Sequence, residues 1–313
     1  MSHNILVTAY SNPDLDGTAC AIAYAEFLQK NGKSALAGLF GIPHREAQFV
    51  FSIFSITQPE DAQKILKDNL DIILVDASDL RGISNKINPL KVIELIDHRK
   101  INQSEAFPNA KIQIELVGSA ATLIAEKFFN KNVEISSNSA ALLYSAIVSN
   151  TVNFQANVTT DRDKKMAKWL IHKFSIPKNY IQNMFAYKSA LRQPLMEIID
   201  HDFAIFDFNN MKIGIGQLEI INVNSFIKYR LIEIESILKK IKKDKRLDII
   251  FLSAIDLEQA NNTFVVIDNK SEALLKRSLN IVFKKNIAKK EGIMMRKTIT
   301  PLLKEILCKF DGE

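Results

Sequence analysis

Aspartates and a histidine stand at the ends of three apolar segments in the first third of the chain. They are Asp14 and Asp16, then Asp76, and then Asp97 with His98. Carboxylate and imidazole groups are ligands that Mn²⁺, Mg²⁺ and Co²⁺ accept, and the spacing Asp14-x-Asp16 lets one carboxylate reach each of two adjacent ions. Such a pair of ions neutralises phosphate oxygens and ionises a water near neutral pH, so these residues predict phosphoryl chemistry.

A lone aspartate at the end of a strand is more often a turn or cap residue than a ligand. Three in succession weaken that alternative, because open α/β sheets place their ligands beyond the carboxyl ends of the strands. The apolar segments are Ile5–Ala9, Asp71–Asp76 and Val92–Asp97. We therefore expect the aspartates to share one rim of a sheet.

The first 150 residues alternate β-branched runs with helical patterns, which is typical of βαβ units around a mainly parallel sheet. A loop is expected over Asn12–Gly17 and a helix over Thr18–Lys30. Three further helices are predicted, at Gly118–Phe129, Ser137–Ser149 and Thr160–Phe174.

The composition changes around Lys188–Pro194, where we place a linker. After it, two β-branched and aromatic runs flank Asn209-Asn210 and predict a tight hairpin of Phe203–Phe208 and Met211–Gln217. Further strands are expected at Asp248–Ala254 and Thr263–Asp268, and helices at Phe226–Lys243 and Pro301–Phe310. The sequence thus predicts an α/β protein, with a mainly parallel-sheet domain at 1–188 and a smaller mixed α/β domain at 195–313.

The composition fits a globular protein with two cores, since 313 residues are 47% hydrophobic. No apolar stretch reaches the roughly 18 residues of a membrane span, and a strand begins too soon after Met1 for a secretory signal. We therefore expect a cytoplasmic protein with no membrane partner. The net charge of +6 suits an anionic partner, but the lysines at 239–245 interrupt a helical Ile/Leu pattern, so a solvated helix face explains them and nucleic acid is not required.

Four ordered motifs resemble those of the DHH phosphoesterases. Within that family they are most similar to the branch of manganese-dependent (family II) inorganic pyrophosphatases and exopolyphosphatases. The motifs are Asn12-Pro-Asp-Leu-Asp16, Leu74-Val-Asp76, Ile96-Asp-His-Arg99 and Ser145-Ala-Ile-Val-Ser-Asn150-Thr. In the second half, Met295-Arg-Lys297 resembles the family's substrate clamp. The resemblance spans nearly the whole chain, and it implies a DHH domain and a DHH-associated domain with the active site in the cleft between them.

The resemblance implies a set of metal ligands. Asp14 would bind a first ion, Asp16 and His98 a second, and Asp76 both. The amide oxygen of Asn150 would complete the second site. The expected cofactor is Mn²⁺, or Mg²⁺ or Co²⁺ in its place, with one or two ions per chain.

The resemblance also implies catalytic and substrate-binding groups. The catalytic set would consist of Asp76, Asp97, His98 and Arg99. Substrate phosphate would be bound by Arg99, Arg296 and Lys297, because a guanidinium makes forked contacts with phosphate oxygens and an ammonium supplies a point charge.

Three positions depart from the family's pattern. Tyr10 stands where the pyrophosphatases have a histidine ligand, Arg99 where they have a second histidine of the third motif, and Asn150 where they have an aspartate. A neutral phenol is a poor ligand and an amide brings no charge, so metal affinity should fall. The changes also shift the expected substrate away from pyrophosphate itself.

Two hypotheses follow. In the first, the chain hydrolyses a phosphoanhydride in pyrophosphate, a short polyphosphate or a nucleotide phosphate; the second metal site holds one ion firmly and the other ion enters with the substrate. In the second, the chain is a catalytically degenerate relative that binds a phosphorylated ligand or a partner. The resemblance is also compatible with a homodimer through the first domain's sheet.

Overall fold

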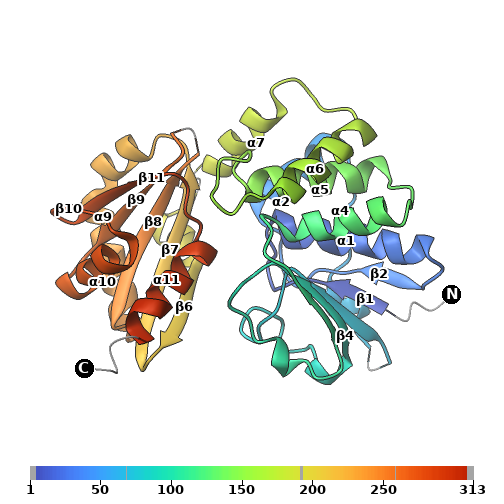
Figure 1. Cartoon of the computed structure of the whole chain (residues 1–313), viewed down its shortest axis with the longest axis horizontal. Coiled ribbons are helices and arrows are strands. Elements are labelled where there is room, and N and C mark those ends of the chain that lie inside the picture. The colour runs from blue at the N-terminus through green and yellow to red at the C-terminus, as the bar shows by residue number, and fades with distance from the viewer. Residues whose placement is uncertain (1–4, 68, 191–192, 258, 309–313) are drawn as a thin grey trace. The chain divides into compact units, whose positions relative to one another are not determined.

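The computed structural model describes residues 5–67, 69–190, 193–257 and 259–308. The chain divides into two compact units (Figure 1). The first comprises Met1–Phe154 and Val158–Tyr187, and the second comprises Gln155–Asn157 and Lys188–Glu313. No helix among the described residues is both long enough and apolar enough to cross a membrane.

Within the described residues, the first unit contains a parallel sheet of five strands in the order β2-β1-β3-β4-β5. The strands are β1 (Ile5–Thr8), β2 (Ala35–Ala37), β3 (Asp71–Val75), β4 (Val92–Asp97) and β5 (Lys111–Ile114). This sheet confirms the mainly parallel fold expected for the first half of the chain. The sequence pattern does not predict β2 and β5, because both are short edge strands without a long apolar run.

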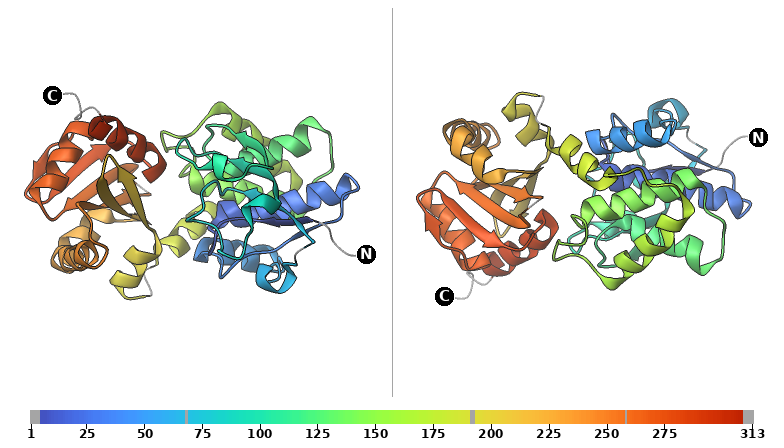
Figure 2. Two further views of the ribbon diagram at one scale, coloured as in Figure 1. Left: turned by 90° about the horizontal axis from the view of Figure 1, so that it is seen from below. Right: turned by 90° about the horizontal axis from the view of Figure 1, so that it is seen from above.

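Helices α1 and α4 pack against this sheet, and α5 packs on both of them (Figures 1 and 2). The helices of the first unit are α1 (Leu15–Lys30), α2 (Arg45–Phe54), α3 (Ala62–Ile65), α4 (Ala120–Asn130), α5 (Ser137–Asn150), α6 (Asp161–Leu170) and α7 (Tyr180–Ser189), with 3-10 turns at Pro89–Lys91, Ser104–Ala106 and Ile171–Lys173. Helix α5 is buried continuously from Ser139 to Ser149, as expected for a helix inside a layer of helices.

The start of α1 corrects the loop expected over Asn12–Gly17. The helix begins at Leu15, three residues before the expected Thr18. Asp14 caps it, because its side chain accepts a hydrogen bond from the amide of Gly17. Asp16 therefore lies in the first turn of a helix and not in a loop.

The second unit contains a mixed sheet with the order β10-β11-β9-β8-β7-β6 among the described residues. Only β7 and β8 pair in parallel within this sheet as it is described. The strands are β6 (Phe203–Phe208), β7 (Met211–Ile220), β8 (Ile249–Asp256), β9 (Asn261–Val266), β10 (Phe283–Lys284) and β11 (Ile287–Glu291). The expected mixed α/β fold of this half is confirmed.

The β6–β7 hairpin is also confirmed. Phe208 pairs with Met211 in the antiparallel ladder, which leaves Asn209 and Asn210 as the two loop residues. Their φ angles are 49° and 57°. Both lie in the left-handed region that a two-residue hairpin turn of this kind requires, and asparagine enters that region more readily than most residues.

Helices cover both faces of the second sheet. They are α8 (Leu195–His201), α9 (Val223–Asp244), α10 (Asn269–Leu279) and α11 (Arg296–Cys308). Alternate residues of β8 point to opposite faces: Ile250 and Leu252 share a core with α8 and α9, while Ile249 lines a cavity with α10 and α11.

The boundaries of two helices differ from those expected. Helix α11 begins at Arg296, five residues before the expected Pro301, which lies inside it. Helix α8 begins directly after Pro194, so the linker expected over Lys188–Pro194 is reduced to residues 190–194 between α7 and α8. Residues 191–192 of it lie outside the described range.

Candidate metal centre

The carboxyl ends of β1, β3 and β4 lie side by side because these strands are parallel neighbours. Asp76 directly follows β3 and Asp97 is the last residue of β4. Asp16 comes from the first turn of α1, which follows β1. The expected gathering of acidic residues at one rim is therefore present.

The carboxylate of Asp16 is buried and lies against the amino end of α4. It accepts hydrogen bonds from the amides of Ala120 and Ala121, at 2.9 and 2.8 Å, and from the Ser119 hydroxyl at 2.8 Å. The Nδ2 atom of Asn150 donates a further hydrogen bond of 2.6 Å. A helix amino end favours a negative charge, so these donors fix the carboxylate in one orientation.

Burial and the charge of Asp76 act against the negative form of Asp16. Burial is the larger effect, and together they raise the pKa of Asp16 to about 7. A divalent ion beside the two carboxylates would remove this repulsion, because it favours the charged form of each.

Asp76 has a backbone φ of 52°, which is in the left-handed region. Such a conformation is uncommon for a residue other than glycine and tends to occur at functional sites. The amide of Asp76 donates to the carbonyl of Ile96 at 2.8 Å, which holds the turn against β4. The left-handed turn thus lets the chain leave β3 sharply while keeping the carboxylate buried at the rim.

The imidazole of His98 is held in a defined tautomer. Its Nδ1 atom lies 3.0 Å from the carbonyl oxygen of Val117. A carbonyl can only accept, so Nδ1 carries the proton and Nε2 presents a lone pair. Nε2 lies 3.3 Å from Oδ1 of Asp76 and 3.7 Å from Oδ2 of Asp16.

Asp16, Asp76 and His98 form a buried triad that fits a metal ion. One ligand atom of each lies within 4.8 Å of the others, and no further group of this kind occurs among the described residues. Two ligand atoms that are each about 2.0–2.2 Å from one ion lie about 2.8–3.6 Å apart at usual coordination angles. The two Nε2 separations are close to this range, and the donors are those that Mn²⁺ accepts.

Asp14 stands outside this triad, although the sequence predicts it as a ligand of the first ion. Its Oδ1 atom accepts the Gly17 amide at 3.0 Å as the cap of α1. Its own amide donates to the hydroxyl of Tyr10 at 2.9 Å. Burial, followed by the charge of Asp14, raises the pKa of Tyr10 well above its usual value, so the phenol keeps its proton.

Asp97 and Arg99 form a second polar group beside the triad. The carboxylate of Asp97 is buried and accepts hydrogen bonds from the His98 amide, the Ser78 hydroxyl and the Arg99 guanidinium. Burial disfavours the charged form, but the positive charge of Arg99 holds the pKa of Asp97 below its usual value. Arg99 also contacts Asp76, so it joins the ends of β3 and β4.

Three residues that hold these ligands in place were not predicted from the sequence, namely Glu46, Ser119 and Asp163. Glu46 of α2 accepts the Leu15 amide at 3.3 Å and the Ser149 hydroxyl at 2.7 Å. Asp163 accepts the amide of Gly118 at 2.9 Å and so anchors the segment that carries Ser119. The Thr160-x-x-Asp163 capping box is a local signal, but the contacts of Glu46 and Ser119 with the site are long-range and leave no pattern in the sequence.

The other two predicted site residues, Arg296 and Lys297, lie in the second unit at the amino end of α11. The guanidinium of Arg296 forms an ion pair with Asp202 at 2.6 Å and also donates to the Asp202 carbonyl at 2.9 Å. Its backbone amide donates to Oε1 of Gln217 at 2.8 Å. These contacts fix the direction of the side chain at a helix end, where anions are commonly bound.

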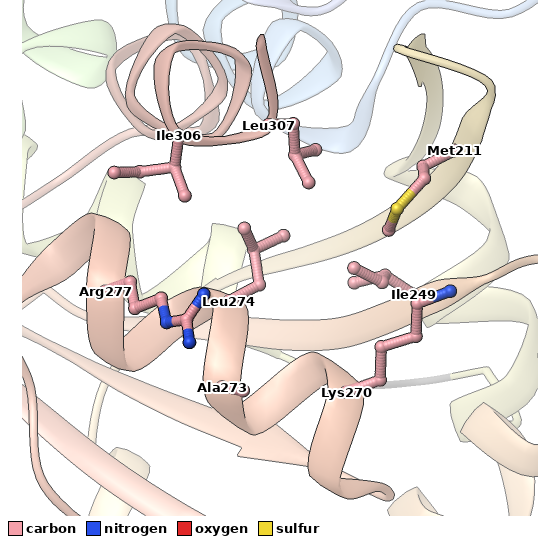
Figure 3. Close-up of a pocket in the computed structure, with 8 residues that line it drawn as sticks. All are labelled: Met211, Ile249, Lys270, Ala273, Leu274, Arg277, Ile306 and Leu307. Atoms are coloured by element: carbon pink, nitrogen blue, oxygen red, sulfur yellow. The ribbon is translucent and has the colours of Figure 1, made fainter. Parts of the chain in front are cut away.

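A small apolar cavity in the second unit is separate from every predicted site residue. Its volume is about 160 Å³, and Leu274 of α10 and Leu307 of α11 point into it (Figure 3). Met211 and Ile249 contribute from the sheet. The lining has no polar group of the kind that the metal centre offers, so the candidate chemistry stays with the rim of the first sheet.

Comparisons with known proteins agree over nearly the whole chain. Residues 4–147 match the family model "DHH family, N-terminal domain", and residues 182–306 match the DHHA2 domain. A relative from Clostridium acetobutylicum, named a probable manganese-dependent inorganic pyrophosphatase, is 30% identical and covers 98% of this chain and 99% of its own length. The manganese-dependent inorganic pyrophosphatase of Methanocaldococcus jannaschii is 32% identical, with 93% and 95% covered.

A solved structure is similar as well. It is titled "Crystal structure of Methanococcus jannaschii putative family II inorganic pyrophosphatase", and it is 31% identical to this chain. The TM-score is 0.83, with 97% of this chain and 99% of that chain covered.

Proposed function

The chain belongs to the DHH family, in the branch of the manganese-dependent inorganic pyrophosphatases, and from this membership we propose that it is a metal-dependent hydrolase of phosphoanhydride bonds. The observation that carries the proposal is the buried triad of Asp16, Asp76 and His98. It offers two carboxylates and one oriented imidazole at the rim where parallel α/β sheets bind ligands.

Asp16, Asp76 and His98 would hold the ion, which we propose to be Mn²⁺, with Mg²⁺ or Co²⁺ as substitutes. When bound, the ion supplies positive charge to phosphate oxygens and lowers the pKa of a water to near neutrality. The α4 amides keep Asp16 oriented, and the Val117 carbonyl keeps the proton of His98 on Nδ1. Asn150 can offer its Oδ1 atom to the ion while its Nδ2 atom remains bonded to Asp16.

Arg296 and Lys297 are proposed to bind the outer phosphate of the substrate. Arg296 is held by Asp202 through one edge of its guanidinium, and forked contact with phosphate oxygens uses the same planar group. Lys297 follows it in the first turn of α11 and adds a point charge. We also retain as proposals the functional domains at 1–188 and 195–313, a cytoplasmic location and a homodimer.

The substrate is proposed to be pyrophosphate or a short polyphosphate, with nucleotide phosphates as a third class. The names of the relatives support pyrophosphate. The differences at Tyr10, Arg99 and Asn150 support testing polyphosphates and nucleotide phosphates together with pyrophosphate. At two of these positions, Tyr10 and Asn150, the family pattern has a metal ligand.

Phosphate release from a panel of substrates tests the proposal. The purified chain is stripped of metal with a chelator, and Mn²⁺, Co²⁺ or Mg²⁺ is then added with pyrophosphate, tripolyphosphate or nucleoside triphosphates. We expect release that requires the metal, with Mn²⁺ most effective. Metal binding and phosphate-ligand binding without release from any substrate would instead support the catalytically degenerate hypothesis.

A further inference from the structure

The guanidinium of Arg99 is bound to the proposed metal ligand Asp76. Its Nη2 atom lies 3.1 Å from Oδ1 of Asp76, the same oxygen that lies 3.3 Å from the imidazole of His98. Its Nη1 atom donates to the backbone carbonyl of Asp76 at 2.7 Å and to both carboxylate oxygens of Asp97 at 3.1 Å. Asp76 thus already has a positive charge beside it on the protein.

The surroundings of Arg99 hold it there. The guanidinium carbon lies 5.7 Å from the centre of the Tyr10 ring, on which it packs. An arginine guanidinium keeps its positive charge in proteins, and the carboxylates of Asp76 and Asp97 lie against it. The side chain is 28% exposed, so most of it is enclosed by these partners. Arg99 is therefore a permanent cation in a fixed position.

The side of the site where a first ion is expected offers fewer metal-binding atoms, because a phenol stands where an imidazole ligand is expected. Tyr10 stands beside Asp14, and its hydroxyl accepts a hydrogen bond from the Asp14 amide. One oxygen of Asp14 is used in capping α1. Asp14 lies outside the triad of ligand atoms that come within 4.8 Å of one another in the described residues. Only the Asp16, Asp76 and His98 side therefore presents a converging ligand set.

We propose that Arg99 takes the place of one of two divalent ions, so that the chain binds a single ion at Asp16, Asp76 and His98. In this arrangement Asp76 joins an ion and a guanidinium and does not bridge two ions. The inference rests on the proposed function for the identity of the ion, but it concerns the number of ions and the role of Arg99. The expected number of ions per chain narrows from one or two to one. The first role of Arg99 is then to neutralise Asp76, and any contact with substrate phosphate depends on the position that Asp76 gives it.

The first experiment counts the ions in the native chain without substrate. The full chain is stripped with a chelator, loaded with Mn²⁺ and desalted, and its manganese is measured by mass spectrometry. Electron paramagnetic resonance then reports whether neighbouring ions are magnetically coupled. We expect one Mn²⁺ per chain with the hyperfine spectrum of an isolated ion; two coupled ions per chain would overturn the inference.

Two variants test whether Arg99 is the cause. The double variant Tyr10→His with Arg99→His removes the guanidinium and supplies an imidazole next to Asp14, and it is expected to double the manganese content and to give a coupled spectrum. Arg99→Lys keeps a positive charge near Asp76 and is expected to stay at one ion. A double variant with native circular dichroism that still binds one uncoupled ion would contradict the assigned role of Arg99.

The outcome is separable from that of the proposed function, because the ion count needs no turnover. One ion without phosphate release supports the inference and contradicts the hydrolase. Two coupled ions with phosphate release contradict the inference and support the hydrolase. A chain that takes up no manganese contradicts the inference, and it contradicts the hydrolase as well if Co²⁺ and Mg²⁺ also give no phosphate release.

Discussion

The contact between Asn150 and Asp16 distinguishes this site from one with an aspartate at the same position. The Nδ2 atom of Asn150 donates to the carboxylate of Asp16 at 2.6 Å, and a hydrogen bond to a charged group contributes about 1.5–3 kcal/mol. An amide therefore stabilises the metal-free site, whereas a second carboxylate there would repel Asp16 until an ion is bound.

Asn150→Asp tests this balance. Without metal we expect the variant to lose about 2 kcal/mol of unfolding free energy, from the lost hydrogen bond and the new repulsion. With Mn²⁺ we expect a larger rise in melting temperature than in the native chain, because the ion gains a charged ligand. Thermal unfolding with chelator and with Mn²⁺ measures both effects.

The control for this substitution is Asn130→Asp. Asn130 ends α4 as Asn150 ends α5, but it is exposed, so it reports only the unfavourable effect of an acid at a helix end. An equal loss of stability in both variants, with no difference in the response to Mn²⁺, would argue against the role of Asn150.

The sequence could predict the residues of the triad but not those that orient them. Asp76 and His98 follow buried strands, and Asp16 lies three residues past the first loop's proline, so each has a local signal. The contact of Ser119 with Asp16 joins residues 103 positions apart, and the Glu46 contact with Ser149 also spans 103. Nothing in one sequence ties such residues together before the fold is known.

At the scale of elements, the β6–β7 hairpin gives a prediction that does not involve the site. Asn210 has a φ of 57°, a conformation that glycine adopts freely and alanine does not. We expect Asn210→Ala to lower the unfolding free energy by about 1 kcal/mol and Asn210→Gly to leave it nearly unchanged or slightly higher. Chemical denaturation of the two variants measures this; equal losses would contradict the left-handed turn.

Glu26 of α1 ties that helix to the start of α5. Its carboxylate accepts hydrogen bonds from the Ser136 amide and hydroxyl and from the Ser139 hydroxyl, and it pairs with Lys30 at 3.0 Å. Burial alone would raise the pKa of Glu26, but these hydrogen bonds lower it. When folding lowers the pKa of a carboxyl group, its charged form stabilises the native state at pH values above the pKa in the unfolded chain, about 4.3. This stabilisation is lost as the pH falls through the pKa in the folded chain.

Glu26→Gln should therefore cost about 1–2 kcal/mol of unfolding free energy at neutral pH, from the loss of the charge in these hydrogen bonds. The difference from the native chain should shrink as the pH is lowered from about 5 to about 3. Urea unfolding at a series of pH values measures it, with the exposed Glu60→Gln as control. A difference that stays constant over this range would contradict the account.

The sequence predicted elements with a long periodic pattern, but it did not predict the short edge strands β2 and β5 or the starts of α1 and α11. Strand β4 has the expected bounds, and the three helices α4, α5 and α6 begin within two residues of the expected positions. The start of α1 is missed because Asn12 to Asp16 reads as a turn, although Asp14 in fact caps a helix. The start of α11 is missed because Pro301 is a usual first-turn residue, and here it lies well inside the helix.

At the scale of the whole molecule, the two units carry different groups of the proposed site. The first unit carries the ligand triad and Arg99, and the second carries Arg296 and Lys297. The net charge of +6 agrees with an anionic substrate without requiring a nucleic acid. From a change in composition the sequence predicts a linker near 188–194 and hence two domains, but it could not show that Arg99 is bound to Asp76.

The measurement that tests the central claim most directly is Mn²⁺-dependent phosphate release from pyrophosphate by the native chain and a matched pair of variants. Asp76→Ala removes the buried ligand after β3, while Asp71→Ala removes an exposed aspartate at the start of the same strand. We predict that the native chain and Asp71→Ala release phosphate when Mn²⁺ is added and that Asp76→Ala does not, with its manganese content reduced as well. Equal release by a folded Asp76→Ala variant, or no release by the native chain with Mn²⁺ bound, would contradict the account.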